Sequence, residues 1–222
     1  MKKNIAMRVA AFLFILTMIS TCAFATTFAK YTTDGTATDT ARVAKWGVKV
    51  EATNAEKLFA STYNGTVTAA DSADVVAPGT EETFGGFTIT GTPEVSVNVT
   101  YTAELTLDGW KVGSADYCPI VIIVNGTPYS DSTMTGLISK VEAAIAGQSK
   151  TYNVADYSGT NPIVDVLEVS WYWAFDNTVT GAKPAHPDQE DDKDTALGDW
   201  ERLGNAAPTI KLDITCTVTQ ID

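Results

Sequence analysis

Apolar and polar residues alternate strictly along two long stretches of this chain. Between positions 95 and 107 the odd positions are Val95, Val97, Val99, Tyr101, Ala103, Leu105 and Leu107, and polar residues separate them. Near the C-terminus the same period gives Ile210, Leu212, Ile214, Cys216 and Val218. Because successive side chains of a strand point to opposite faces, both stretches predict long strands with one buried and one solvated face.

Shorter strand-like runs fill much of the remaining chain, and Gly, Pro, Asn and Asp separate them. These runs are residues 46–52, 58–68, 82–90, 118–124, 151–154 and 164–175. Many strands divided by turn residues predict an all-β fold, an antiparallel jelly-roll β-sandwich in which two sheets face each other. One helix interrupts the pattern over residues 132–148, where Leu137, Val141 and Ile145 recur at helical spacing. We expect it to cover an edge or an end of the sandwich.

The N-terminus has the parts of a secretory signal peptide. Lys2, Lys3 and Arg8 precede an apolar run over residues 9–19, which is shorter than the roughly 20 residues that a bilayer-spanning helix needs. The pattern therefore predicts export to the cell surface or medium rather than a retained anchor. We expect cleavage between Ala29 and Lys30, with a second candidate position after Ala25. The predicted organisation is a signal over residues 1–29, an arm over residues 30–44 and one domain over residues 45–222.

Charge excludes one class of partner. The chain has 15 Lys and Arg against 27 Asp and Glu, a formal net charge of −12, and loss of the first 29 residues, with three basic and no acidic ones, makes this −15. Such a surface repels phosphate, so nucleic acid is not an expected partner, whereas divalent cations are plausible counter-ions. A hydrophobic content of 45% in a chain of this length indicates one folded domain.

An acidic stretch within residues 176–207 is the candidate metal site. Three prolines in or beside this segment indicate a surface loop. Carboxylates are the oxygen ligands that Ca²⁺ prefers, but the spacing lacks the glycine and terminal glutamate of an EF-hand, so a simply solvated run is the alternative. The candidate Ca²⁺ ligands are Asp188, Glu190, Asp191, Asp192 and Asp194.

Two cysteines remain after the signal peptide is removed with Cys22. Cys118 and Cys216 both occupy apolar positions of strand-like runs. An exported protein meets an oxidising space, so the two could form a disulfide. Two separate buried cysteines that act as small hydrophobic residues remain equally open.

No catalytic apparatus is recognisable, and we expect a protein that is not an enzyme. The only histidine is His186, so a zinc site of the H-E-x-x-H type cannot form, and no G-x-S-x-G, P-loop or dinucleotide motif is present. Trp171, Tyr172 and Trp173 could stack on sugars if exposed. Alternation instead places Trp171 and Trp173 on one face, which favours core packing and leaves Tyr172 and Trp200 available.

Three segments resemble the TasA/camelysin family. They are Thr27-Phe28-Ala29-Lys30-Tyr31, the strand Trp171-Tyr172-Trp173-Ala174-Phe175 with the acidic segment ending in Asp194-Thr195-Ala196-Leu197-Gly198, and the closing Thr217-Val218-Thr219-Gln220. The likeness covers both ends of the mature chain, whereas the middle is similar only in general pattern. It implies export through a SipW-type signal peptide and a jelly-roll subunit of extracellular biofilm-matrix fibres or pili. Camelysin-like members are also labelled metallopeptidases, for which this chain has no zinc motif.

The predicted arm suits strand donation between subunits, which the family resemblance also implies. It is polar and rich in threonine, so it cannot form a core alone but can add a strand to an open sheet edge. A head-to-tail contact of this kind does not close and therefore produces a filament. The arm residues singled out are Lys30, Tyr31, Thr32, Thr33 and Val43.

Alternatives for the arm and for the whole protein remain open. The arm could fold back on its own domain or stay disordered. A monomeric cell-surface binding or adhesion module is the main rival function, and an exported metallopeptidase is the third. The expected partners are further copies of the chain and other matrix or cell-wall components, with no membrane span after processing.

Overall fold

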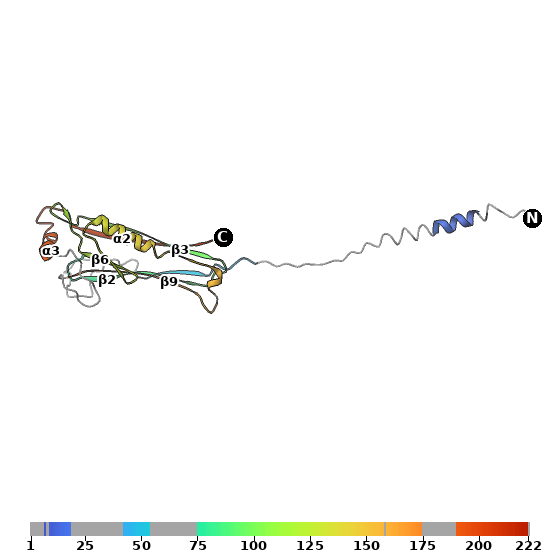
Figure 1. Cartoon of the computed structure of the whole chain (residues 1–222), viewed down its shortest axis with the longest axis horizontal. Helices are drawn as coiled ribbons and strands as arrows, with labels where there is room; N and C mark the ends of the chain where they lie inside the picture. The colour runs from blue at the N-terminus through green and yellow to red at the C-terminus, as the bar shows by residue number, and fades with distance from the viewer. Residues whose placement is uncertain are drawn as a thin grey trace, which may run out of the picture. The chain divides into compact units, whose positions relative to one another are not determined.

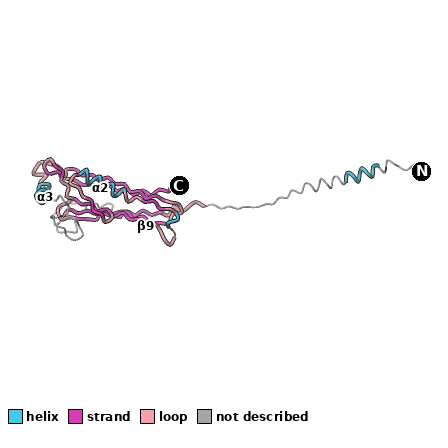
Figure 2. The backbone as a smooth tube through the Cα atoms, in the orientation of Figure 1, coloured by secondary structure: helices cyan, strands magenta, loops and turns pink. Residues whose placement is uncertain are grey.

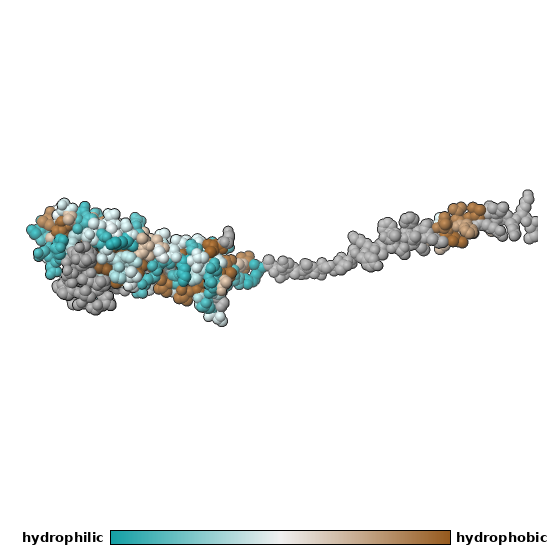
Figure 3. All heavy atoms as spheres, in the orientation of Figure 1, coloured by the Kyte–Doolittle hydropathy of each residue, from teal (hydrophilic) through white to brown (hydrophobic). Residues whose placement is uncertain are grey.

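A computed structural model describes residues 7, 9–18, 42–53, 75–157, 159–174 and 190–221 of the chain, without the side chains of residues 82–84. The chain divides into two compact units, Met1–Arg42 and Val43–Asp222. In the first unit, residue 7 and residues 9–18 are helical and exposed, and Figure 3 shows this helix as a continuous apolar segment. Among the described residues, no helix is both long and apolar enough to cross a membrane. The predicted cleavage point at Ala29 and Lys30 and the arm residues Tyr31, Thr32 and Thr33 lie outside the described residues.

Antiparallel sheets dominate the second unit (Figure 2). The larger sheet has the strand order β1-β2-β9-β6-β7. Its strands are β1 (Val48–Thr53), β2 (Glu81–Gly91), β9 (Ile163–Trp173), β6 (Ile120–Val124) and β7 (Thr127–Tyr129). The smaller sheet has the order β10-β3-β8, formed by β10 (Thr209–Gln220), β3 (Val97–Asp108) and β8 (Lys150–Tyr152). A short ribbon pairs β4 (Lys111–Val112) with β5 (Ala115–Asp116), and the predicted all-β, antiparallel class is thereby confirmed.

The two sheets face each other across one hydrophobic core (Figure 1). Ile89 of β2, Val99 of β3 and Leu167 of β9 are fully buried in it. Along β3 the odd positions are buried or half-buried and the even ones are mostly exposed, as the alternation predicts. Six of the strands, β2, β3, β6, β8, β9 and β10, fall alternately in the larger and the smaller sheet, so both sheets contribute to the core throughout.

Helix α2 (Met134–Ala146) covers one edge of β3, which confirms the predicted covering role. Thr133 caps the helix, because its hydroxyl accepts a hydrogen bond from the Gly136 backbone N–H at 3.0 Å. Strand β8 pairs only with residues Val97 to Val99 of β3. Beyond that point side chains replace the missing strand: the Tyr101 N–H donates to Ser149 Oγ and the Leu105 N–H donates to Glu142 Oε1, both at 3.0 Å.

Substitution of Glu142 tests this cover. Glu142→Ala removes the acceptor of a backbone N–H beside the buried Leu105, and we expect the free energy of unfolding to fall by about 1–3 kcal/mol. Glu142→Gln is the matched control, because its amide oxygen can still accept. Urea denaturation of the three proteins checks this, and equal stabilities would show that the helix side chain does not satisfy the strand edge.

Other segments differ from the sequence expectations. Residues 151–154 were expected to be one strand, but β8 ends at Tyr152 and a 3₁₀ turn, η1 (Val154–Asp156), follows with Asn153 and Asp156 in a capping box. Short strands β4, β5 and β7 were not predicted, because two or three residues carry no readable period. The strand expected over residues 58–68 lies outside the described residues.

Candidate assembly edge and apolar pocket

The longest open sheet edge in the described part of the chain belongs to β10. Among the described strands, β1 and β10 each pair with a neighbour on one side only. The other outer strands, β7 and β8, have three residues each, and β7 contains Pro128. Strand β10 has twelve residues, all paired with β3. An open edge of this length is a template for pairing with another strand.

The hydrogen bonds of β3 show which backbone groups of β10 point outward. The N–H groups of Tyr101 and Leu105 point toward α2, so the odd residues of β3 face away from β10. Even residues of β3 therefore bond to β10, and their partners there include Asp213, opposite Glu104, and Thr215, opposite Thr102. The backbone groups that point to the open edge are those of Ile210, Leu212, Ile214, Cys216, Val218 and Gln220.

Side chains on β10 leave this edge polar on its outer face. Leu212 is fully buried, and Lys211 and Asp213 on the opposite face form an exposed ion pair at 2.6 Å. The exposed positions that follow are Thr215, Thr217 and Thr219. Charged residues discourage unselective edge pairing, whereas threonines pair well with threonines of a neighbouring strand.

The chain enters the second unit at the end where β10 finishes. The Lys45 backbone N–H donates to Glu94 Oε2 at 2.8 Å, and the Glu94 N–H donates to the Lys45 carbonyl at 2.9 Å. Nearby, the Ile221 N–H donates to the Ser96 carbonyl. Val43 is 92% exposed and Trp46 is 42% exposed at this end. Val43 and Trp46 therefore present apolar side chains at the end of the unit that holds the C-terminus (Figure 1).

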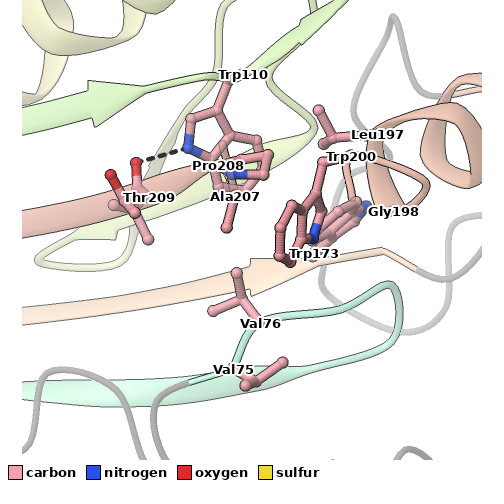
Figure 4. Close-up of a pocket in the computed structure, with 11 residues that line it drawn as sticks. Val75, Val76, Trp110, Trp173, Leu197, Gly198, Trp200, Ala207, Pro208 and Thr209 are labelled. Carbon is pink, nitrogen blue, oxygen red and sulfur yellow. Dashed lines mark hydrogen bonds between the residues drawn. The ribbon is translucent and has the colours of Figure 1, made fainter. Parts of the chain in front are cut away.

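An apolar pocket of about 390 Å³ lies at the opposite end, where β10 begins (Figure 4). Trp110, Trp173 and Trp200 contribute rings to it, and Leu197 and Ile210 add aliphatic side chains. The Trp110 and Trp173 ring centroids are 5.5 Å apart with a 55° angle between the planes. Trp110 is fixed because its Nε1–H donates to the Thr209 carbonyl at 2.8 Å. A volume in this range is typical of sites that hold organic groups.

One polar atom at the pocket lacks a hydrogen-bond partner within the described part of the chain. Trp173 is 5% exposed, and its Nε1–H finds no acceptor among the residues that the structure describes. Buried indole N–H groups usually have a partner, and an unpaired buried donor costs about 1–3 kcal/mol. An apolar guest that brings one carbonyl or hydroxyl oxygen would match this pocket.

The acidic segment is helical where the structure describes it, so the loop interpretation is wrong there. Helix α3 (Asp191–Gly198) begins in the acidic run. Carboxylates in the first turn of a helix stabilise it, because they lie near the positive end of the helix dipole. Asp194 is 7% exposed, and its Oδ1 accepts a hydrogen bond from the Tyr117 hydroxyl at 2.6 Å. The Tyr117 oxygen also accepts a hydrogen bond from the Glu190 N–H. These two bonds attach the start of α3 to Tyr117, the residue before Cys118.

The calcium hypothesis gains no support from this arrangement. Asp188 lies outside the described residues, so the full set of Asp188, Glu190, Asp191, Asp192 and Asp194 stays a prediction. In the described part of the chain, no three His, Cys, Asp or Glu side chains come close enough to hold a metal ion.

Cys118 and Cys216 are both free, so the disulfide interpretation is wrong. The Tyr117 N–H donates to the Trp110 carbonyl, which places Cys118 near Thr209 at the start of β10. Cys216 lies seven residues farther along β10, about 23 Å away in an extended strand. A disulfide requires Cα atoms within about 7 Å. Burial raises the pKa of the Cys118 thiol to about 12, so it is an inert core residue.

The aromatic run of β9 is part of the core. Trp171 and Trp173 are 1% and 5% exposed, which confirms the core interpretation. Tyr172 was expected to be available for stacking, but it is also buried. Trp200 lies at the apolar pocket, and His186 lies outside the described residues.

A partly buried polar contact links the two sheets. Asp165 of β9 accepts hydrogen bonds from the hydroxyl of Tyr101 at 2.9 Å and from the hydroxyl of Tyr152 at 2.5 Å. Burial, and then the bond to Asp165, raises the pKa of both tyrosines above the ordinary value. Burial alone raises the pKa of Tyr172 to about 12.

These tyrosines make the fold sensitive to alkali. A hydroxyl whose pKa is raised by folding contributes stability that is complete below the unfolded pKa of about 10 and is lost as the pH rises toward the folded value. We expect the free energy of unfolding to fall above pH 10 by about 1.4 kcal/mol per pH unit for each such tyrosine. Urea denaturation between pH 8 and pH 12 measures the slope, and Tyr101→Phe should flatten it. An unchanged slope in Tyr101→Phe would contradict this assignment.

No model of a known protein family matches the sequence, and no curated protein matches it either. The resemblance to the TasA/camelysin family therefore rests on its short motifs. The sequence pattern predicted the edge strands β1 and β10 as strands but gave no sign of the pocket. The pocket is lined by residues that are far apart in the sequence, such as Val76, Trp110, Trp173 and Pro208. The number of tryptophans is the only sequence feature that could have indicated an aromatic pocket.

Proposed function

We propose that this protein is a secreted, non-enzymatic subunit of an extracellular fibre or pilus of the biofilm-matrix type, in which the N-terminal arm of one copy adds a strand to the next copy. The observation that carries the proposal is the twelve-residue edge of β10, with six residues whose backbone groups point outward. We also infer that the two facing sheets form a jelly roll, in line with the family resemblance.

The N-terminal arm and the open edge of β10 have similar lengths when both are extended. Residues 30–42 are thirteen residues, which span about 43 Å when extended, and the twelve residues of β10 span about 40 Å at the same rise of about 3.3 Å per residue. The threonines of the arm would lie beside those on the outer face of β10, an arrangement that favours cross-strand pairing.

Arm and edge also agree in direction. The chain enters its domain at the end where β10 finishes, near Ile221, and the start of β10 lies at the other end. An arm that extends from one copy along the next copy therefore runs antiparallel to the β10 that receives it. The contact uses different surfaces on the two partners, so it repeats without closing and gives a filament.

Proline substitution on β10 tests the proposal. Val218→Pro removes an outward N–H but no hydrogen bond to β3, and proline is tolerated on an open edge. We expect this variant to fold, as judged by circular dichroism, and to form no filaments under negative-stain electron microscopy at concentrations where the mature wild-type protein does.

A matched control uses the same strand. Val218→Thr changes the same side chain but keeps its N–H, so it should polymerise like the wild type. Filaments of normal length from folded Val218→Pro would rule out the β10 edge as the acceptor. A wild-type protein that remains monomeric would favour the rival function, a monomeric surface-binding module.

A further inference from the structure

We propose that the apolar pocket at the start of β10 is a socket for a second copy of this chain, which inserts Trp46, with Val43 beside it. The inference rests on the proposed strand donation and adds a specific site to it. It joins an exposed apolar segment and an apolar cavity that lie at opposite ends of the same unit.

Geometry brings these two features together in a head-to-tail pair. If residues 30–42 of one copy run antiparallel along β10 of another, the arm reaches the start of β10 at its C-terminal end. The next residues of the arriving chain, 43–46, then lie beside residues 205–208 of the receiving chain. Ala207, Pro208, Thr209 and Ile210 belong to the pocket wall, so the open edge leads directly to the pocket (Figure 4).

The chemistry of the pocket suits this guest. Tryptophan rings surround much of the space, and they favour tilted or offset contact with another aromatic ring. The segment around Trp46 also brings backbone carbonyls, and one of them can accept the hydrogen bond that Trp173 Nε1–H lacks within the described part of the chain. An aromatic side chain that fills a pocket at the centre of an interface is the usual form of a binding hot spot.

Trp46 is an exposed aromatic residue in the described part of the unit. It is 42% exposed, and it is not part of the hydrophobic core or of the residues packed against it. Trp110 and Trp173, by contrast, are core residues that hold the pocket in shape whether or not a guest is present. The socket is therefore preformed, and Trp46 can be changed without removing a core contact.

Two variants measure the contribution of the inserted ring. We expect Trp46→Ala to raise the critical concentration for polymerisation at least about tenfold, as loss of a hot-spot residue does, and Trp46→Phe to restore most of the wild-type value. Ala207→Trp alters the receiving copy. Ala207 is exposed and lines the pocket, so a tryptophan ring at this position would fill the pocket. It should weaken polymerisation to a similar extent while the monomer stays folded.

Cross-linking tests the contact directly. Ala44→Cys combined with Ala207→Cys should give a ladder of disulfide-linked dimers, trimers and longer chains on a non-reducing gel. Each single variant, which retains the native Cys118 and Cys216, is the control and should give no ladder.

The outcomes separate the socket from the proposed function. Wild-type filaments together with normal polymerisation of Trp46→Ala and Ala207→Trp, or with no ladder from the double-cysteine protein, would overturn the socket and leave strand donation intact. Absence of filaments from the wild type would overturn both.

Discussion

Deletion of residues 30–39 from the mature protein should abolish filament growth and leave a soluble, folded monomer. The core of the second unit, as far as the structure describes it, is built from residues between Val48 and Val218, and the proposal assigns the deleted segment to the sheet of a neighbouring copy. Without the arm, the outward backbone groups of β10 have no strand to pair with. Negative-stain electron microscopy and sedimentation velocity measure the loss, and thermal unfolding verifies the fold.

A replacement of equal length shows what the arm supplies. If residues 30–39 are exchanged for a Gly-Ser tract, the chain keeps its reach but loses threonines that favour a strand. We expect this variant to polymerise poorly as well. Polymerisation of the deletion variant would mean that the arm is not the donor strand, whereas its failure to fold would show that the arm is a strand of its own domain.

Trp171→Ala should lower the free energy of unfolding by about 3–5 kcal/mol, the cost of removing a large buried ring and leaving a cavity. Trp171 is 1% exposed and lies on β9, between Glu82 of β2 and Ile122 of β6. Since small domains have only about 5–15 kcal/mol of stability, much of the protein would unfold at moderate temperature. Urea denaturation gives the difference directly.

Trp46→Ala is the matched control for this prediction. Trp46 is partly exposed and outside the core, so its loss should change monomer stability by no more than about 0.5 kcal/mol. Equal losses in the two variants would contradict the assignment of Trp171 to the core and of Trp46 to the surface.

Hydrogen bonds along β10 would not hold a filament together by themselves. Six outward residues offer up to twelve bonds, and at about 0.5–1.5 kcal/mol each they give roughly 6–18 kcal/mol. Association costs about 4–15 kcal/mol in translational and rotational entropy, and ordering a flexible arm costs further conformational entropy. Edge pairing alone is therefore marginal, and a buried ring such as that of Trp46 at the end of the arm would make the contact stable.

The sequence predicts strands where their period is long enough to read. The alternation from Val97 to Leu107 and from Ile210 to Val218 appears in the structure as β3 and β10, with the expected residues facing the core. The helix around Leu137, Val141 and Ile145 is also readable, because burial of one face imposes a spacing of three or four residues.

Contacts between distant segments could not be predicted in this way. Alternation does not specify which strands pair, so it could not show that Cys118 lies near the start of β10, whereas Cys216 lies seven residues farther along that strand. Helix α3 has little apolar periodicity, and it is attached to the rest of the unit by the buried Leu197 and by the hydrogen bond between Asp194 and Tyr117, a partner that no local pattern reveals. The pocket depends on the same kind of long-range placement.

Residue-resolved hydrogen exchange of β10 tests the central claim most directly. In the monomer, the outward amides of Leu212, Ile214 and Val218 should exchange fast, while those of Asp213, Thr215 and Thr217, bonded to β3, should be protected. In filaments, exchanged and then dissolved under quench conditions, both sets should be protected. Outward amides of β10 that still exchange fast in the filament would contradict strand addition at this edge.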